Sequence, residues 1–599
     1  MTKANRIIGL FIATSSCVLS LQANAERYMV KMRSNATFKQ EVAALKDAIR
    51  TGRFQAGSRI LGDRVRYVDS LAHSNLLIVD SDDAATVAGL QFNPEVEYVE
   101  QERWIKIPNL GLAAKSQFVS VNAAEEMPWG LGAVHAQNAW TKATQGARGA
   151  GARVAVIDSG IDRAHIDLAD RFERGEDFLS KPKLEEPSLP EQLDGSRLFA
   201  SFIDDIFVQD PSDTTPYPYF DRMGHGTHVA GTIAASQNGR GVVGVAPEAK
   251  ILAGRVCGFL GCSTVGIVRA IDWAITQRVD VINMSLGGPF PSRAQLEATE
   301  RAEAAGITVV AASGNDGSSS IGYPAGFPTV VSVGAVTPAL QRASFSQHGT
   351  GLTITAPGTE VNSSVPTGTG RTGRVWTSTD GSDSEVAATS FLGSNATSGI
   401  VGADLVHAKL GTKEDFMAIK SGALSGKFAL IQRGVIPFVE KIENAIAAGA
   451  AGVVIYNNDA GLASGALTED GSDIGIPVLM IEQRVGEALA AKLVVGDAAS
   501  VRVQVSPTDF ASFQGTSMAS PHVAGVVALM KAANRALTPE QIRTILKMTA
   551  DKAAYMNEFE YGSGLSNAER AIEFIESTRQ NNWNAPNDES GTPNLASSH

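Results

Sequence analysis

A serine at the start of a long apolar segment is the residue of this chain best placed to act as a nucleophile. The sequence GTS at 515–517 leads into an apolar run over 518–533, which predicts a small turn followed by a helix. Ser517 would lie at the helix N-terminus, where free N–H groups and the macrodipole favour negative charge, so its hydroxyl could attack a carbonyl there. The alternative is that Ser517 only caps the helix. Pro521 is expected in the first turn, where its missing N–H group is not needed.

Acyl transfer by a serine also needs a base of near-neutral pKa, a carboxylate that orients the base, and donors for the oxyanion. His225 lies between glycines in GHGTH at 224–228, and Asp158 follows a buried strand predicted over 153–157. Each has a structural alternative. Asp158 could be a turn residue, and His225 with His228 forms an H-x-x-H pair that could bind a metal, although no third ligand is evident.

Three short segments resemble the signatures of the subtilisin-like serine proteases (subtilases, peptidase S8 family). They are DSGID at 158–162, GHGTHVAG at 224–231 and GTSMA at 515–519, in the chain order of the subtilisins. The resemblance implies that Asp158 orients the base, His225 is the base and Ser517 is the nucleophile. AASGN at 311–315 resembles the family's oxyanion segment, which implies that Asn315 and the Ser517 N–H hold the tetrahedral oxygen. The alternative for Asn315 is a turn residue, since Asn-Asp-Gly favours turns.

The same resemblance implies where a substrate binds. The segments 258–263 and 285–288 resemble the two edge strands that sandwich a substrate backbone, which is recognition by β-augmentation. Gly322 matches the floor of the pocket for the P1 side chain, and a glycine there implies a roomy pocket that prefers large apolar or aromatic residues. The implied substrate-binding positions are Gly261, Ser285, Leu286, Gly287, Gly288, Ala312, Ser313, Gly314 and Gly322.

The elements that must position these residues follow an alternating pattern of strands and helices. Over 126–375, resumed at 507–578, this pattern predicts an α/β domain with a mainly parallel sheet, and the resemblance implies the three-layer α/β/α fold of subtilisin. Asp158, 285–288 and 313–315 all follow predicted strand ends, where open α/β sheets bind ligands. The interval between His225 and Ser517 is too long for a minimal domain of this kind. It therefore predicts an insert at 376–506, which resembles a protease-associated (PA) domain.

The N-terminal part of the chain is expected to be removed in two steps. Residues 1–25 have the charged, apolar and A-x-A regions of a secretory signal peptide, so the protein is expected to be secreted. Residues 26–125 predict a small ferredoxin-like α+β unit that resembles the family's inhibitory propeptide (inhibitor I9 type), ending in an Ala-rich link. This implies a zymogen that processes itself. The tail at 579–599 is polar and is expected to be disordered.

Composition and charge restrict the partners of the protein. A net charge of −12 argues against nucleic acid or an anionic membrane as a partner. Polypeptide substrates and the chain's own propeptide are the expected partners of a monomer. No cofactor is expected for the chemistry. Structural calcium is common in the resembled family, and Asp204, Asp205 and Asp210 could contribute to a site, although solvated loop acids are the alternative.

Two cysteines remain once the signal peptide is removed. Cys257 and Cys262 lie close together in a chain expected to be exported, which predicts a disulfide. The alternative, a metal site, lacks a second pair of ligands.

The main hypothesis is therefore a secreted, self-processing serine endopeptidase of broad specificity. Two other functions compete with it. One is an inactive relative that binds proteins through its insert. The other is an esterase, but GTSMA lacks the final glycine of the G-x-S-x-G turn.

Overall fold

The computed structural model describes most of the chain between residues 26 and 579. The described residues are 26–51, 60–61, 65–105, 111–112, 125–144, 148–179, 217–258, 260–379, 382–459, 461–462, 467 and 473–579. They fall into two compact units, one containing residues 1–103, 180–201 and 292–297 and the other containing the rest. The predicted signal peptide, Asp204, Asp205, Asp210 and the tail beyond 579 lie outside the described residues.

The N-terminal unit is built on a four-stranded antiparallel sheet in the order β2-β3-β1-β4. Its elements are β1 (Glu26–Met32), α2 (Asn35–Thr51), β2 (Arg66–Leu71), β3 (Leu76–Ser81), α3 (Ala84–Gly89) and β4 (Val96–Gln101). Apolar side chains of the strands pack with Phe38 and Leu45 of α2 in one core. The βαββαβ order confirms the predicted ferredoxin-like fold. The structure also locates β2, whose residues no sequence pattern had identified.

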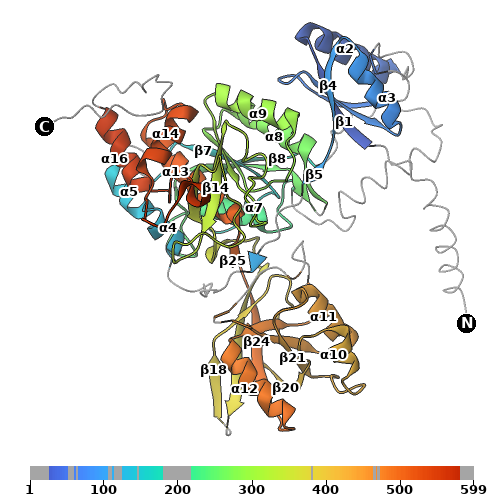
Figure 1. The fold of residues 1–599 in the computed structure, drawn as a ribbon, viewed down its shortest axis with the longest axis vertical. Helices are drawn as coiled ribbons and strands as arrows, with labels where there is room; N and C mark the ends of the chain where they lie inside the picture. Colours follow the sequence, from blue (N-terminus) through green and yellow to red (C-terminus); the bar gives the residue numbers. More distant parts are fainter. Residues whose placement is uncertain are drawn as a thin grey trace, which may run out of the picture. The chain divides into compact units, whose positions relative to one another are not determined.

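The second unit contains a seven-stranded sheet in the order β15-β14-β13-β12-β7-β9-β8, in which every pairing is parallel (Figure 1). The strands are β7 (Arg153–Asp158), β8 (Phe172–Asp177), β9 (Lys250–Arg255), β12 (Val281–Met284), β13 (Thr308–Ala312), β14 (Val330–Val336) and β15 (Ile354–Pro357). The strands β12, β13 and β14 are buried throughout and mostly apolar, because helices cover both faces of a parallel sheet. This confirms the predicted α/β fold.

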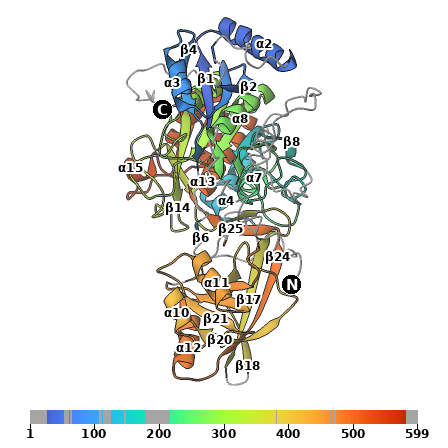
Figure 2. The same ribbon diagram turned by 90° about the vertical axis from the view of Figure 1, so that its right-hand side faces the viewer.

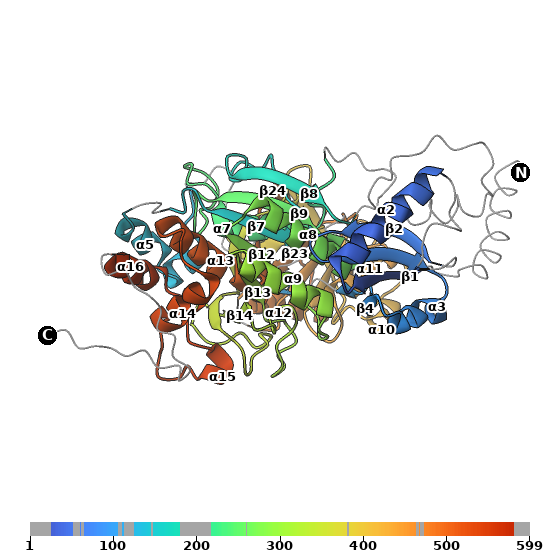
Figure 3. The ribbon, with the colours of Figure 1, turned by 90° about the horizontal axis from the view of Figure 1, so that it is seen from above.

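The helices of this part of the chain come from segments far apart in the sequence. They are α4 (Trp129–Ala133), α5 (Ala136–Lys142), α7 (His225–Ala234), α8 (Thr264–Gln277), α9 (Arg293–Ala304), α13 (Thr516–Ala533), α14 (Pro539–Thr549), α15 (Glu558–Tyr561) and α16 (Ala568–Arg579). α13 packs on β12 to β15 and against α7, while α8 packs on β7 and β9. α5 and α14 pack against α16, which contacts α13 (Figure 3). Every apolar residue of α13 is buried except Ala532, so this helix forms the centre of the core.

The predicted insert is a separate eight-stranded mixed sheet in the order β18-β17-β24-β20-β21-β22-β23-β19. Its elements are β17 (Gly370–Thr379), β18 (Ser382–Val386), β19 (Ala388–Ser390), β20 (Val401–His407), α10 (Lys413–Met417), β21 (Phe428–Gln432), α11 (Phe438–Ala447), β22 (Gly452–Tyr456), β23 (Val478–Ile481), α12 (Gln483–Val494) and β24 (Ser500–Thr508). Successive residues of β22 belong to two different core clusters, because side chains alternate between the faces of a strand.

A two-stranded antiparallel ribbon connects the insert to the α/β domain. β16 (Val361–Ser364) pairs with β25 (Phe510–Gln514), and the pairing resumes between β17 and β24 at Gly370 and Thr508 (Figure 2). β25 ends at Gln514, three residues before Ser517. The ribbon therefore leads from the insert directly to the predicted nucleophile.

Among the described residues, no helix is both long enough and apolar enough to span a membrane.

Candidate active site

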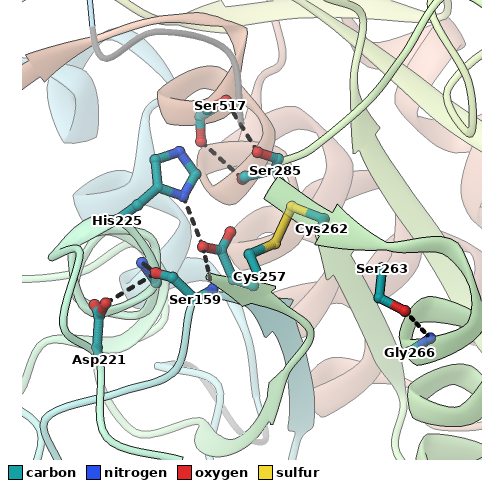
Figure 4. The surroundings of a disulfide bond; sticks show 11 residues. Ser159, Asp221, His225, Cys257, Cys262, Ser263, Gly266, Ser285 and Ser517 are labelled. Carbon is teal, nitrogen blue, oxygen red and sulfur yellow. Dashed lines mark hydrogen bonds and ion pairs between the residues drawn. A yellow bond between two sulfur atoms is a disulfide. The ribbon is translucent and has the colours of Figure 1, made fainter. Parts of the chain in front are cut away.

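Asp158 and His225 form a buried hydrogen-bonded pair between the end of β7 and the start of α7. The His225 Nδ1–H donates to Asp158 Oδ1 at 2.7 Å, and both side chains are 1% exposed (Figure 4). The Ser159 N–H donates to the same carboxylate oxygen, also at 2.7 Å. Burial lowers the pKa of His225, but the adjacent Asp158 carboxylate outweighs it, so the pKa is raised above its usual 6.5. The carboxylate thus holds the imidazole in one tautomer and favours the imidazolium.

A second buried carboxylate, Asp221, fixes the first turn of α7. It accepts hydrogen bonds from the N–H groups of Met223, Gly224 and Thr227 at 2.7 to 3.0 Å and from the Thr227 hydroxyl at 2.7 Å. It also accepts one from the Ser159 hydroxyl at 2.9 Å. Asp221 was not identified from the sequence, although an acidic residue just before a helix is a recognisable capping signal.

Ser517 is the second residue of α13 and is not its N-cap. The cap position belongs to Gly515, whose φ of 151° suits glycine, and no side chain caps the helix. The alternative that Ser517 only caps the helix is therefore wrong. Its hydroxyl donates to the Ser285 carbonyl at 3.0 Å. The imidazole of His225 points toward Ser517 in Figure 4, and within the described residues its Nε2 has no hydrogen-bond partner.

Pro521 lies in the second turn of α13, so its expected place in the first turn is wrong. A proline there cannot donate to the carbonyl four residues earlier, which is that of Ser517. The Ser285 hydroxyl donates to this carbonyl instead, at 2.8 Å. Ser285 in turn accepts from Asn283 Nδ2 at 3.0 Å, and Asn283 Oδ1 accepts from the Ser520 hydroxyl at 2.6 Å. This buried network joins the end of β12 to the nucleophile helix.

Asn315 is placed to supply an oxyanion donor. Its side-chain Oδ1 accepts from the Thr516 N–H at 2.9 Å and from the Thr516 hydroxyl at 2.8 Å, which leaves the Nδ2 group directed elsewhere. A Cβ added to Gly515 would lie 3.0 Å from Asn315 Nδ2 and 3.6 Å from the Ser517 nitrogen. Both nitrogen atoms thus lie within 3.6 Å of one position. The turn alternative for Asn315 does not account for this proximity.

The two predicted substrate strands lie on either side of a segment of the chain itself. β10 (Cys257–Gly258) and β11 (Gly261–Ser263) form a hairpin, and β11 pairs with β5 (Trp104–Ile105), so that Cys262 faces Ile105. A Cβ on Gly288 would lie 3.2 Å from Ile105 Cγ2, so Ile105 sits between β11 and the second predicted edge segment. β6 (Gly111–Leu112) pairs with β25, with Gly111 opposite Gln514.

The predicted P1 pocket residues also come together. Gly288 and Tyr323 form an antiparallel bridge, and the Gly322 N–H donates to the Ser313 carbonyl at 2.9 Å. A Cβ on Gly322 would lie 3.3 Å from the Ser313 oxygen and 3.4 Å from the Gly288 oxygen. Gly322 thus faces the space between these two segments. Ala312 ends β13 and Ser313 and Gly314 follow it directly, while Leu286 and Gly287 follow β12.

The two predicted metal alternatives find no support in the geometry. His228 Nε2 lies 3.0 Å from the Val361 carbonyl and 3.1 Å from the Ala511 carbonyl, and its ring stacks on Phe513, so it joins β16 to β25. Burial lowers the pKa of His228 to about 3. Cys257 and Cys262 form the predicted disulfide. The described part of the chain contains no cluster of three or more His, Cys, Asp or Glu residues that could hold a metal ion.

Comparison with known proteins agrees with this geometry. The subtilase family model matches residues 149–398 and 490–564, and the PA domain model matches 395–489. Subtilisin E of Bacillus subtilis (strain 168) is 35% identical over 337 residues, which cover 55% of this chain and 73% of that protein. Subtilisin of Bacillus pumilus is 41% identical over 251 residues, 41% of this chain and 78% of that protein. The crystal structure of a psychrophilic subtilisin-like protease from Pseudoalteromonas sp. AS-11 is 29% identical and covers 76% of this chain and 99% of that chain, with a TM-score of 0.49.

Proposed function

This chain belongs to the subtilase family of serine endopeptidases, and we propose that Asp158, His225 and Ser517 carry out its peptide-bond hydrolysis. The observation that carries the assignment is the buried pair of His225 and Asp158, whose free Nε2 points toward Ser517. The proposed chemistry uses only groups of the chain.

The mechanism begins with a rotation of the Ser517 hydroxyl. It leaves the Ser285 carbonyl, to which it donates at 3.0 Å, and turns to His225 Nε2. His225 takes the proton as Ser517 Oγ attacks the substrate carbonyl, and Asp158 stabilises the imidazolium that forms. The Asn315 Nδ2 group and the Ser517 N–H donate to the oxyanion. His225 then protonates the leaving amine. In the second half of the reaction His225 takes a proton from water, the water oxygen attacks the acyl-enzyme carbonyl, and His225 returns the proton to Ser517 Oγ as the acid product leaves.

Specificity follows from the backbone pairing and the open P1 pocket. The edges at β11 and 285–288 bind extended peptide through main-chain hydrogen bonds, which do not depend on side chains. Gly322 adds no side chain to the pocket, and the described segments 285–288 and 312–314 contain no carboxylate that would favour a basic P1 residue. We infer a broad preference for large apolar or aromatic P1 residues.

The N-terminal unit is proposed to be an inhibitory propeptide that the protease removes from itself. β5 and β6 support this, because they pair with strands on the two sides of the nucleophile: β11 beside the substrate edges, and β25 directly before Gly515. A chain held on both sides of Ser517 is bound as a substrate is. We therefore infer that self-cleavage occurs between Ile105 and Gly111, upstream of the boundary at residue 125 that the sequence predicted.

Four further properties are proposed from the sequence alone. They are removal of a signal peptide at residues 1–25, secretion, a monomeric state, and a role for the insert at 376–506 in access of protein substrates. Structural calcium is not part of the proposal, since the three candidate aspartates lie outside the described residues.

One experiment tests hydrolysis and maturation together. Wild type and Ser517→Ala would be expressed in a host lacking extracellular proteases, then assayed on casein and analysed by N-terminal sequencing. Wild type should hydrolyse casein and begin between residues 106 and 111, and the alanine variant should accumulate as an inactive precursor. A processed alanine variant would refute self-cleavage, and an active one would refute the nucleophile.

A further inference from the structure

The disulfide of this protein lies inside the β10–β11 hairpin, whose second strand is one of the two edges proposed to pair with substrate. Cys257 of β10 and Cys262 of β11 are directly opposite each other in the hairpin register, and Gly258 faces Gly261 at its tip. Both cysteines are fully buried. Gly261, the first residue of β11, has a φ of 109°, a conformation that only glycine adopts readily.

The bridge fastens β11 to the strand that holds the candidate catalytic aspartate. β10 follows β9 after one residue, Val256, whose N–H donates to the Asp158 carbonyl at 2.8 Å. The Val256 carbonyl accepts from the Ser263 N–H at 3.0 Å. In Figure 4 the bridge lies between His225 and Ser263. One edge of β11 is thus fixed to the frame of the catalytic pair.

The opposite edge of β11 is the one that takes a substrate-like strand. Cys262 pairs with Ile105 and Ser263 with Trp104, both antiparallel. β11 has only three residues, and its C-terminal end is fixed by Ser263, whose hydroxyl accepts from the Gly266 N–H at 2.8 Å and caps α8. On its β10 side, the described contacts of the N-terminal end of β11 are the bridge and the pairing with the two residues of β10.

We propose that the Cys257–Cys262 disulfide is a positioning element for substrate: it holds β11 extended before a peptide arrives, and so sets the affinity for substrates long enough to pair with β11. This inference rests on the proposed function. A strand that is already extended pays no ordering cost when the peptide pairs with it, whereas a loose strand must be ordered at that moment. Reduction of the bridge would then weaken binding of extended peptides more than it affects the catalytic groups.

A purely structural role makes a different prediction. A bridge with a sequence separation of 5 closes a very short loop, and short loops restrict the unfolded chain least. If the bridge only stabilised the domain or protected an exposed turn from cleavage, its loss would affect all substrates alike.

The test compares a tetrapeptide p-nitroanilide, which reaches β11, with a single-residue ester, which does not. Mature wild type and Cys257→Ser/Cys262→Ser would be assayed on both, with Ile575→Val in the core of α16 as a destabilised control. Loss of the bridge should lower the ratio of kcat/KM for the tetrapeptide to that for the ester by about tenfold, through KM of the tetrapeptide, an effect equivalent to ordering about one residue. The Ile575→Val ratio should equal that of wild type.

An equal loss on both substrates, or an unaltered ratio, would overturn the proposal, as would two free thiols in secreted wild type by mass spectrometry. If the double variant does not fold, wild type assayed with and without a phosphine reductant, its free thiols counted after denaturation, provides the same ratio. Failure of the proposed function is recognised separately, because wild type would then hydrolyse neither substrate.

Discussion

The α/β domain and the insert both contain parallel strands with polar residues at their carboxyl ends, but only one of them has a reactive group there. In the insert, Arg433 follows β21 and donates to Asn457 Oδ1 at 2.9 Å, and Asn457 donates to the Gly461 carbonyl at 2.9 Å. In the α/β domain, Asp158 is the last residue of β7 and accepts a hydrogen bond from His225, whose Nε2 stays unpaired within the described residues. Polar strand ends therefore do not by themselves make a site. What distinguishes the α/β domain is a buried histidine, His225, whose Nε2 has no hydrogen-bond partner among the described residues and points toward Ser517.

The two regions also differ in how their polar ends are supported. The nucleophile arrives on α13, and its carbonyl is held by Ser285 from a different strand because Pro521 removes the helical donor. His225 arrives on α7, which Asp221 caps. Helices carry reactive groups to the strand ends here, whereas in the insert the polar groups come from adjacent loops and satisfy one another.

The largest effect should follow from removing either reactive group. Ser517→Ala or His225→Ala should lower kcat by about 10⁶, the loss found for the corresponding groups of a subtilisin, because nucleophile and base act as a unit. Arg433→Ala in the insert is the matched control and should stay within about twofold of wild type, since exposed contacts away from the site contribute little. Steady-state hydrolysis of a short peptide gives both values. If Ser517→Ala kept kcat within tenfold of wild type, Ser517 would not be the nucleophile.

The next effect concerns the oxyanion donors. Asn315→Ala removes the Nδ2 donor and should lower kcat by about 10²–10³, the loss found when one such donor is removed from a subtilisin, with KM little altered. Pre-steady-state assays would show a slower acylation step. Because Asn315 Oδ1 also holds Thr516, Asn315→Asp serves as a control that keeps this acceptor without the donor. An aspartate variant with wild-type kcat would contradict the role of Nδ2.

Asp221 should have a smaller effect with a distinctive pH dependence. Activity requires neutral His225, so it should rise with pH through a midpoint above 6.5, since Asp158 and, to a lesser extent, Asp221 raise the pKa of His225. Asp221→Asn removes one charge, so the midpoint should move to lower pH, while kcat/KM at pH 8 falls about tenfold from the weaker helix cap. A pH–kcat/KM profile measures both. An unmoved midpoint would mean that Asp221 acts only as a cap.

Much of this candidate site could be predicted because its residues lie in short contiguous motifs. The residues that hold these motifs in place through hydrogen bonds could not be predicted. Asp158, His225, Asn315 and Ser517 were identified from the residues around them. Asp221 supports α7, and the Ser285 hydroxyl supplies the hydrogen bond that Pro521 cannot donate. Both contacts are side-chain hydrogen bonds, for which the sequence has no periodic signal. The fold followed from the alternation of strands and helices.

The chain's own β5 and β6 show a second limit of the sequence. Each strand is only two residues long, and short pairings of this kind depend on where the partner strand lies rather than on a pattern within the segment. Residues 96–107 alternate in a way that predicts one continuous strand, whereas the structure has β4 ending at Gln101 and β5 at 104–105.

Deleting the insert should change substrate choice more than chemistry. Removal of 376–506 leaves β16 and β25 paired, since their register from Val361–Phe513 to Ser364–Phe510 lies outside the deletion. We expect hydrolysis of short peptides within about tenfold of wild type, a margin that allows for the loss of one buried side chain. Leu392 is that side chain, because it belongs to the core cluster of the α/β domain. Cleavage patterns of casein should differ from wild type. Equal loss on peptides and casein would mean that the insert shapes the catalytic core.

The last prediction concerns stability rather than activity and assigns acid sensitivity to one region. His522 is fully buried in α13, its Nδ1–H donates to the Met518 carbonyl at 2.8 Å, and burial lowers its pKa to about 4. The unfolded chain binds a proton at this residue near pH 6.5, and the folded chain does so only near pH 4, so stability is lost as pH falls between these values. From pH 8 to pH 5 the loss of unfolding free energy from this residue should be about 2 kcal/mol.

Urea unfolding of Ser517→Ala, which cannot digest itself, would measure this loss, and adding His522→Asn should remove about that much of the pH dependence. His407→Asn is the matched change in the insert, where the histidine is only half-buried and its pKa is lowered less, so it should remove less of the dependence. If the two substitutions flatten the curve equally, the acid sensitivity does not come from the buried core of the α/β domain.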